Sequence, residues 1–377
     1  MSVRSIIRAQ LDELACGIPA PFDVHAHTGA DIDRTVRSSE EHVADLAAVD
    51  GRSVVFPLCV TTGYRAENER VIAEARRYPA RLVPFARLDP NVDSAAVASA
   101  ALAAGARGFK LHPRSEAFRI EHPGVDAILA VAAEAGVPAL IHAGRGVGSF
   151  GPVLTELAAR HRRCSIILAH AGISDLAWLG GVIGDHPNLF FDTAWWNPTD
   201  VLALFSLIPP AQILHGSDAP YGDVELNLVI TLRCGLAAGL SAEQLALVTG
   251  GQLERLLQGV SPAPAGPVPR ARPHAPRPSD ARVAAFLTAA GGALLGGGDP
   301  WETLELALLA IEPSDARTPP AEDDLIHELL EAIDGTQPTA MRNALVLALT
   351  LSATPGVAAR HRSGIGVPEA VGRASTP

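Results

Sequence analysis

The sequence predicts a (β/α)8 barrel, or TIM barrel, followed by a small all-helical module. Eight short β-rich runs alternate with Ala-rich amphipathic segments over the first two-thirds of the 377 residues. A Pro-rich stretch then interrupts this alternation, and only helical periodicity follows it. Alternating strands and helices imply a parallel sheet, and eight such units close most economically into a barrel, with an open doubly wound sheet as the alternative.

The predicted strands are short runs rich in β-branched, aromatic and other apolar residues. They span residues 22–27, 53–60, 82–88, 108–112, 139–142, 165–170, 189–193 and 213–218. The intervening segments have the apolar spacing of amphipathic helices. They span residues 39–49, 67–78, 94–104, 124–135, 153–161 and 199–207, and the last helical layer covers residues 224–257.

The chain divides at a change of composition. Residues 1–260 are predicted to form the barrel domain, and residues 261–280 a linker, because the dense prolines there cannot sustain a helix or an inner strand. Residues 281–352 contain three or four helical patterns, including 282–290, 301–311, 323–333 and 339–351, and residues 353–377 are predicted to be a disordered tail. A module of ~70 residues is only marginally stable alone, so we expect it to pack on the barrel, on a second copy of the chain or on a protein partner.

Composition excludes several classes of protein. The formal net charge of −11 argues against nonspecific nucleic-acid binding, which needs clustered Lys and Arg. No run reaches the ~20 apolar residues of a membrane span, and the N-terminus lacks the apolar core of a signal peptide, so a cytoplasmic location is expected. The four cysteines form no C-x-x-C pair, which argues against a zinc knuckle or a disulfide framework.

Histidines at strand ends predict a metal site. His25 and His27 lie two residues apart on the first predicted strand, so both side chains project to one face. The fifth, sixth and eighth predicted strands end in His142, His170 and Asp218, which a barrel would bring to the same mouth. Imidazole and carboxylate ligands suit one divalent ion, with Zn²⁺ expected and Mn²⁺ or Fe²⁺ as alternatives.

In this order of residues the chain resembles the amidohydrolase superfamily, specifically its amidohydrolase-related branch. The resemblance covers residues 21–257, and the run Gly-Phe-Lys-Leu-His-Pro at 108–113 is similar to a signature on the fourth strand of that branch. The branch contains metal-dependent barrels that act as hydrolases, nonoxidative decarboxylases and hydratases. The resemblance therefore implies a metal-dependent enzyme but does not identify its substrate.

The resemblance also implies roles for individual residues. It implies a metal held by His25, His27, His142 and Asp218. His170 would be a further ligand or an acid/base, and Asp218 would take a proton from the attacking water and return it to the leaving group. A carboxylated Lys110 bridging two metals, as in binuclear members of the superfamily, is the alternative to a single metal.

Candidate substrate contacts lie on the loops after the strands. Arg145 could bind a substrate carboxylate, and Trp195 could line an apolar or aromatic pocket. His112 is a further pocket candidate, with a loop-stabilising imidazole as the equal alternative. His215 is expected to be structural. The remaining histidines are expected to be solvated, namely His42, His122, His161, His186, His274, His327 and His361.

These observations predict a metal-dependent hydrolase that uses an activated water on a small carbonyl substrate. The first alternative is a nonoxidative decarboxylase of an aromatic or unsaturated acid, for which Arg145 would hold the carboxylate and the tryptophans Trp195 and Trp196 the ring. The second is an inactive barrel that acts as a binding module. The chain has no complete G-x-G-x-x-G, Walker or G-x-S-x-G motif, which disfavours dinucleotide, nucleotide triphosphate and serine hydrolase chemistry.

Overall fold

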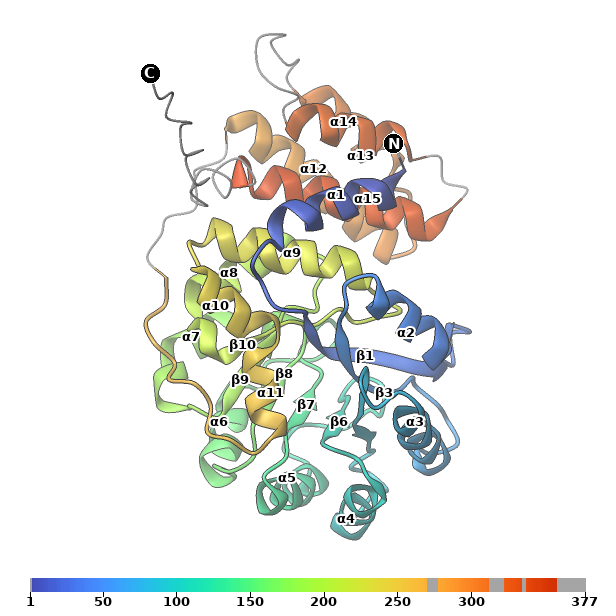
Figure 1. Ribbon diagram of the computed structural model, residues 1–377, viewed down its shortest axis with the longest axis vertical. Coiled ribbons are helices and arrows are strands. Elements are labelled where there is room, and N and C mark those ends of the chain that lie inside the picture. Colours follow the sequence, from blue (N-terminus) through green and yellow to red (C-terminus); the bar gives the residue numbers. More distant parts are fainter. Residues whose placement is uncertain (1, 270–276, 312–321, 334–336, 358–377) are drawn as a thin grey trace, which may run out of the picture.

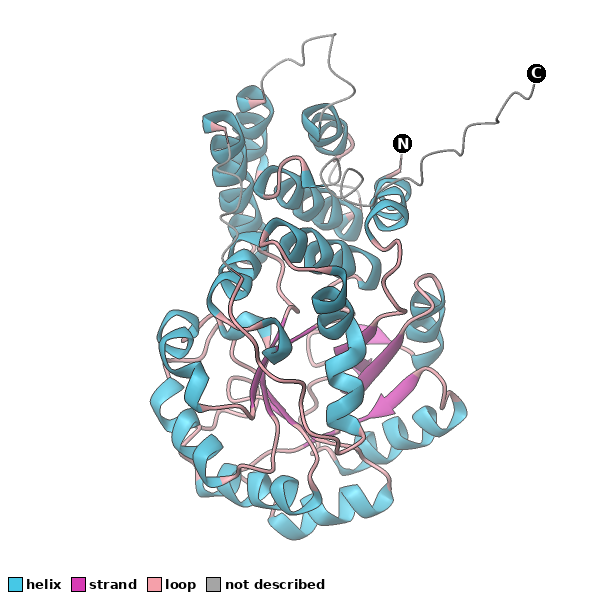
Figure 2. Ribbon diagram, turned by 60° about the vertical axis from the view of Figure 1, so that its left-hand side comes forward, coloured by secondary structure: helices cyan, strands magenta, loops and turns pink. Residues whose placement is uncertain are grey.

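The computed structural model describes residues 2–269, 277–311, 322–333 and 337–357. A ring of parallel strands lies at the centre of the larger part, helices surround it, and a further group of helices stands at one end (Figure 1; Figure 2). The predicted barrel is confirmed. Its strands are β1 (Phe22–Ala30), β2 (Val36–Arg37), β3 (Arg52–Pro57), β4 (Leu82–Pro84), β5 (Ala86–Arg87), β6 (Phe109–Leu111), β7 (Ala139–Ile141), β8 (Ile166–Leu168), β9 (Leu189–Asp192) and β10 (Ile213–Leu214).

The strands form two hydrogen-bonded groups that close on one another. Their orders are β2-β1-β3-β4 and β10-β9-β8-β7-β6-β5, and all neighbours are parallel except the antiparallel pair of β1 and β2. At one junction Phe85 donates its backbone N–H to the carbonyl of Val55 at 2.9 Å. At the other, Val24 of β1 donates to the carbonyl of His215, directly after β10, also at 2.9 Å. The ring is therefore continuous.

Most strands end earlier than the sequence predicts, and three of these differences affect the site. β7, β8 and β10 stop at Ile141, Leu168 and Leu214, so the polar residues expected at their ends lie on the turns that follow. His170 and Asp218 have φ angles of +59° and +57°, a left-handed conformation that cannot continue a strand. The third predicted strand is also divided into β4 and β5, and the two-residue β2 was not predicted because it is too short to show periodicity.

Helices cover the outside of the ring. They are α2 (Ser39–Ala47), α3 (Arg65–Arg77), α4 (Ala95–Ala104), α5 (Pro123–Ala135), α6 (Gly151–Arg160), α7 (Leu176–Val182), α8 (Pro198–Leu207), α9 (Val224–Ala237), α10 (Ala242–Ala246) and α11 (Gln252–Leu257), with α1 (Val3–Leu14) packed on α9. Local signals define their ends: Ser38 and Glu41 form a capping box at α2, and Gly105, with φ +118°, ends α4.

The interior of the ring is filled with apolar side chains. These include Phe22, Val24, Phe56, Phe85, Leu140, Ile167, Phe190 and Leu214. Each fully buried side chain of this kind stabilises the fold by roughly 1.5–3 kcal/mol. A packed interior leaves the ends of the strands as the place for polar chemistry.

The C-terminal region consists of α12 (Pro278–Leu295), α13 (Trp301–Ala310), α14 (Glu322–Glu331) and α15 (Pro338–Ala353). These helices correspond to the four predicted helical patterns, and α12 begins within the stretch predicted as a linker, because proline is tolerated in the first turn of a helix. α15 packs against α1, α8 and α9. Residues 270–276 of the predicted linker and 358–377 of the predicted tail lie outside the described residues. No helix in the described ranges combines the length and apolarity needed to cross a membrane.

Candidate metal centre

Four histidines from three separate segments of the sequence are adjacent at the mouth of the barrel. His25 and His27 project from β1, with ring centroids 5.3 Å apart. The ring of His170, on the short 3-10 turn after β8, lies 5.0 Å from that of His25. His142 follows β7, and its ring lies 4.7 Å from that of His170.

Asp218 brings a carboxylate into this cluster. Its Oδ1 lies 3.2 Å from Nε2 of His25 and 3.3 Å from Nε2 of His27. Its Oδ2 lies 4.0 Å from Nδ1 of His170. The possible ligand atoms of His25, His170 and Asp218 all lie within 4.8 Å of one another, which is close enough for a single ion to contact all three.

Hydrogen bonds orient three of the imidazoles. The contacts are His25 Nδ1 to Asp192 Oδ2 at 2.7 Å, His170 Nδ1 to the carbonyl of Ala194 at 2.7 Å, and His142 Nε2 to the carbonyl of Arg145 at 3.2 Å. Carbonyl and carboxylate oxygens accept, so in a neutral imidazole the bonded nitrogen carries the hydrogen and the opposite nitrogen has a free lone pair. Ligating histidines in metalloproteins are oriented in the same way.

Burial keeps these imidazoles neutral. It lowers the pKa of His25 and His27 well below the ordinary value, and the nearby charge of Lys110 acts in the same direction. Burial also lowers the pKa of His142 to about 2. At Asp218 burial raises the pKa, although the charge of Lys110 opposes this shift. Neutral imidazoles are the form that binds a metal.

Two buried carboxylates hold the cluster in place. Asp192, at the end of β9, uses Oδ1 to accept the backbone N–H groups of His170 at 2.7 Å and Ala194 at 3.0 Å, in addition to its bond to His25. Asp23 accepts the backbone N–H of His25 at 2.8 Å and both the backbone N–H and the hydroxyl of Ser217. Asp23 therefore ties the turn that carries Asp218 to β1.

Lys110 of β6 lies beneath the histidines. Its Nζ is 3.2 Å from Nε2 of His25 and 4.8 Å above the ring centroid of Phe56. Burial lowers the pKa of Lys110 to about 7, although the charges of Asp218 and Asp192 oppose this shift. The amine is therefore part of the same electrostatic cluster as the histidines.

The donor set fits a divalent cation. Nε2 of His25 carries a lone pair and faces the acceptor oxygen of Asp218 at 3.2 Å, an arrangement that a cation between them would stabilise. Nδ1 of His142 is buried and has no hydrogen-bond partner among the described residues. Buried polar atoms are normally paired, so this lone pair is available to a ligand. His27 turns its Nε2 toward Oδ1 of Asp218, at 3.3 Å. Imidazole with carboxylate suits Zn²⁺, Mn²⁺ or Fe²⁺ and leaves the choice of metal open.

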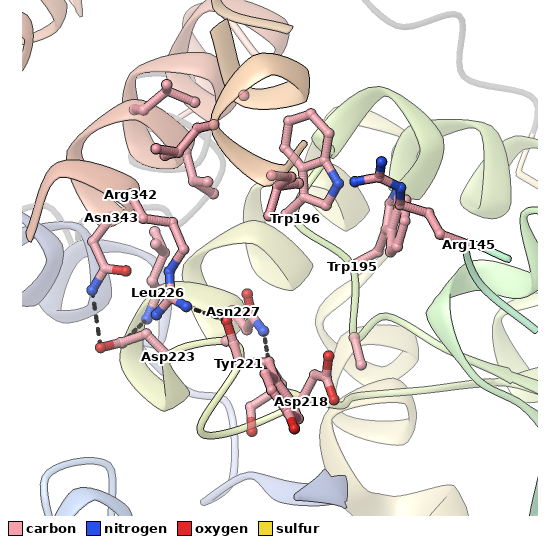
Figure 3. Close-up of a pocket in the computed structure, with 18 residues that line it drawn as sticks. Arg145, Trp195, Trp196, Asp218, Tyr221, Asp223, Leu226, Asn227, Arg342 and Asn343 are labelled. Atoms are coloured by element: carbon pink, nitrogen blue, oxygen red, sulfur yellow. Dashed lines mark hydrogen bonds between the residues drawn. The ribbon is translucent and has the colours of Figure 1, made fainter. Parts of the chain in front are cut away.

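A cavity of about 170 Å³ opens beside Asp218. Figure 3 shows Asp218 at one end of it, with Arg145, Trp195 and Trp196 along one side and Tyr221, Asp223 and Arg342 along the other. The remaining lining is largely apolar and includes residues of α12 and α15. The cavity thus connects the histidine cluster to the C-terminal helices.

The three predicted substrate contacts occupy different places around the centre. Trp195 lines the cavity, its ring lies 5.8 Å from that of His170, and its Nε1 donates to Asp200 at 2.6 Å. Arg145 also lines the cavity, from an exposed position. His112 stacks on His142 with ring centroids 3.9 Å apart, so it contacts the cluster through that ring.

Sequence reasoning missed several residues of the site. Asp192 and Asp23 were not singled out, although both lie on β-rich runs where a charged residue is unusual. Arg342 was missed because nothing in the sequence links α15 to the barrel mouth.

The expectation of solvated histidines was wrong at two described positions. His42 is fully buried on the inner side of α2, and burial lowers its pKa to about 3. His161 is 7% exposed and bonds Asp126 at 2.7 Å. Helical position alone did not reveal which face each residue occupies. His274 and His361 lie outside the described residues.

Comparisons with solved structures agree with the barrel fold. Similar solved structures include a 5-carboxyvanillate decarboxylase from Novosphingobium aromaticivorans with bound manganese, with 12% identity, a TM-score of 0.51, and 65% of this chain and 98% of that chain covered. An IDCase from Metarhizium anisopliae has 13% identity, a TM-score of 0.51 and the same coverage. A TIM-barrel protein from Bordetella bronchiseptica has 15% identity and a TM-score of 0.52, covering 63% and 98%.

These likenesses establish the fold. A search of curated protein sequences finds no significant match. Residues 22–251, which include the whole histidine cluster and Asp218, match the sequence profile of the amidohydrolase family. The chain therefore belongs to the amidohydrolase family.

Proposed function

We propose that this chain is a metal-dependent hydrolase that cleaves a C–N or C–O bond in a small carbonyl substrate. The observation that carries the proposal is the hydrogen-bonding of His25, His142 and His170, each of which has one ring nitrogen bonded to an oxygen. The opposite nitrogen of His142 has no partner among the described residues, and that of His25 lies 3.2 Å from both Lys110 Nζ and Asp218 Oδ1. These imidazoles surround the carboxylate of Asp218 at the mouth of a barrel, where enzymes of this fold have their active sites.

The proposed ligands of a single divalent ion are His25, His27 and Asp218 with one further histidine. His142 is the fourth ligand implied by the resemblance, whereas the compact grouping of His25, His170 and Asp218 favours His170. The histidine that is not a ligand would polarise the substrate carbonyl. A carboxylated Lys110 with a second metal remains the alternative arrangement.

A divalent ion at this position would supply Lewis acidity and lower the pKa of a coordinated water to about 7. Asp218 would accept a proton from the attacking water and return it to the leaving group. Burial raises the pKa of the Asp218 carboxyl, which makes it a better proton acceptor than an exposed aspartate. Asp192 would keep His25 in the tautomer whose Nε2 is free.

Two substitutions distinguish the roles of the histidines. We expect the variant of the fourth ligand, either His142→Asn or His170→Asn, to lose stoichiometric metal. The variant of the other histidine, which would polarise the substrate carbonyl, should keep the metal and lose turnover. His327→Asn, at an exposed position on α14, is the matched control and should change neither quantity. Retention of metal and full turnover by both test variants would contradict the proposed site.

Nonoxidative decarboxylation of an aromatic or unsaturated acid is the second candidate. The cavity favours it, because Trp195 and Trp196 offer ring contacts and Arg145 offers a cation for a carboxylate. A screen over amides, lactones and aromatic acids in ¹⁸O-labelled water separates the two reactions. Incorporation of label into the product supports hydrolysis, whereas release of carbon dioxide without incorporation supports decarboxylation.

A barrel that only binds ligands is the third possibility. It predicts purified protein without stoichiometric metal and with properties independent of His25 and Asp218. Elemental analysis of the intact chain together with His25→Asn and Asp218→Asn variants tests it directly.

A further inference from the structure

The far wall of the cavity beside Asp218 comes from the C-terminal helices. Leu294 and Leu295 of α12 and Leu345 and Val346 of α15 line it. Arg342 of α15 lies on the side of Tyr221 and Asp223, opposite Trp195 and Trp196 in Figure 3. The barrel alone would leave this side of the cavity open.

A buried arginine anchors the C-terminal helices to the barrel. Arg233 of α9 is fully buried, and its guanidinium reaches three other parts of the chain. It donates to Oε1 of Gln10 in α1 at 2.6 Å, to the hydroxyl and carbonyl of Thr354 after α15 at 2.8 Å each, and to Oε1 of Glu322 in α14 at 2.6 Å. Such a charged network is stable only when its partners stay in place, so it holds the helices over the mouth.

Close packing at the cavity itself reinforces this arrangement. Gly291 of α12 lies against the indole of Trp196, where an added Cβ would come within 2.5 Å of the ring. Asn343 of α15 donates to Oδ2 of Asp223 at 3.2 Å, and Arg342 donates to the carbonyl of Tyr221. The wall is therefore built into the packing of the barrel loops.

The size and lining of the cavity restrict what it can hold. An apolar cavity of about 150 Å³ accepts a benzene ring, so 170 Å³ has room for one six-membered ring. Arg145 and Arg342 place a guanidinium on each side. Nε1 of Trp196 is buried and has no hydrogen-bond partner among the described residues, so it is available to an acceptor on a ligand.

We propose that α12 and α15 are the specificity-determining wall of this active site and select a substrate with a single ring and a negative charge. Leu295 and its apolar neighbours limit the size of the ring, and Arg342 favours the anion. The inference rests on the proposed function, because it assigns a substrate class to the same site.

Binding of non-reacting probes to the metal-loaded, full-length protein tests the proposal. We expect benzoate to bind, and 2-naphthoate to bind weaker by about tenfold or more, because a rigid apolar wall rejects added bulk. Leu295 is 44% exposed, so changes there should not unfold the chain. Leu295→Ala should bring the affinity for 2-naphthoate close to that for benzoate, and Leu295→Trp should weaken the binding of benzoate. Arg342→Met should weaken the binding of benzoate by about tenfold or more and leave the affinity for its neutral analogue benzamide unchanged.

Leu309→Trp is the matched control, since Leu309 is 82% exposed on α13 and does not line the cavity. It should bind every probe as the wild type does. Three results would each overturn the proposal. The wild type could bind benzoate and 2-naphthoate with equal affinity, it could fail to bind benzoate, or Arg342→Met could weaken the binding of benzamide as much as that of benzoate. Metal content and turnover are measured separately and test the proposed hydrolase. The probe affinities alone decide the selectivity of the wall.

Discussion

Replacing Asp192 with asparagine should weaken metal binding, although Asp192 is not itself one of the proposed ligands. Its Oδ1 accepts two backbone N–H groups and its Oδ2 accepts Nδ1–H of His25 at 2.7 Å. In Asp192→Asn the amide oxygen would stay with the two backbone donors, and the amide NH₂ would face His25. Two donors cannot pair, so the hydrogen of His25 would move to Nε2, the atom that faces Asp218.

This tautomer change determines the size of the effect. The proposed metal would lose the lone pair of one ligand, while the other ligands would remain. Loss of a carboxylate that orients a ligating histidine typically weakens metal binding about 10–100-fold, equivalent to about 1.4–2.7 kcal/mol. We expect Asp192→Asn to fall within this range and to retain its overall fold, because the substitution is nearly isosteric.

Competition with a chromophoric chelator measures the affinity, and circular dichroism checks the fold. Asp200→Asn is the control, because Asp200 accepts a hydrogen bond from Trp195 near the cavity and forms no hydrogen bond or ion pair with the histidines among the described residues. Metal affinity in Asp192→Asn equal to that of the wild type would refute the proposed orientation of His25.

Two further predictions concern stability and reactivity. Arg233→Met should lower the free energy of unfolding in urea by about 3–5 kcal/mol, because it leaves Glu322 without its buried partner. Arg65→Met, at the exposed pair with Glu69, should cost about 1 kcal/mol or less, and equal losses would contradict the anchoring role. A thiol reagent at pH 8 should modify exposed Cys16 in the native protein and spare Cys164 and Cys234, because burial raises the pKa of both buried thiols, that of Cys164 to about 12. Unfolding should expose all four cysteines, and native labelling of all four would contradict the described burial.

Much of the fold was predictable because it depends on local patterns. Apolar runs and helical periodicity located every parallel strand of the ring apart from exact ends, and Gly and Pro located helix boundaries. The predicted strand ends were wrong at His170 and Asp218, because the sequence does not show that a histidine or an aspartate adopts a left-handed φ. The prediction that His42 is solvated was wrong for a related reason, because the sequence of a short helix does not reveal which side packs on the barrel.

The sequence by itself determined the barrel, the family resemblance and the set of residues from which a metal site could be built. These depend on residue type and spacing along the chain, which are local properties. Only the tertiary structure decided that Asp192 orients His25, that Asp23 holds the turn of Asp218, and that α12 and α15 close the cavity. Such contacts join segments more than a hundred residues apart, and their geometry is set by packing of the whole chain.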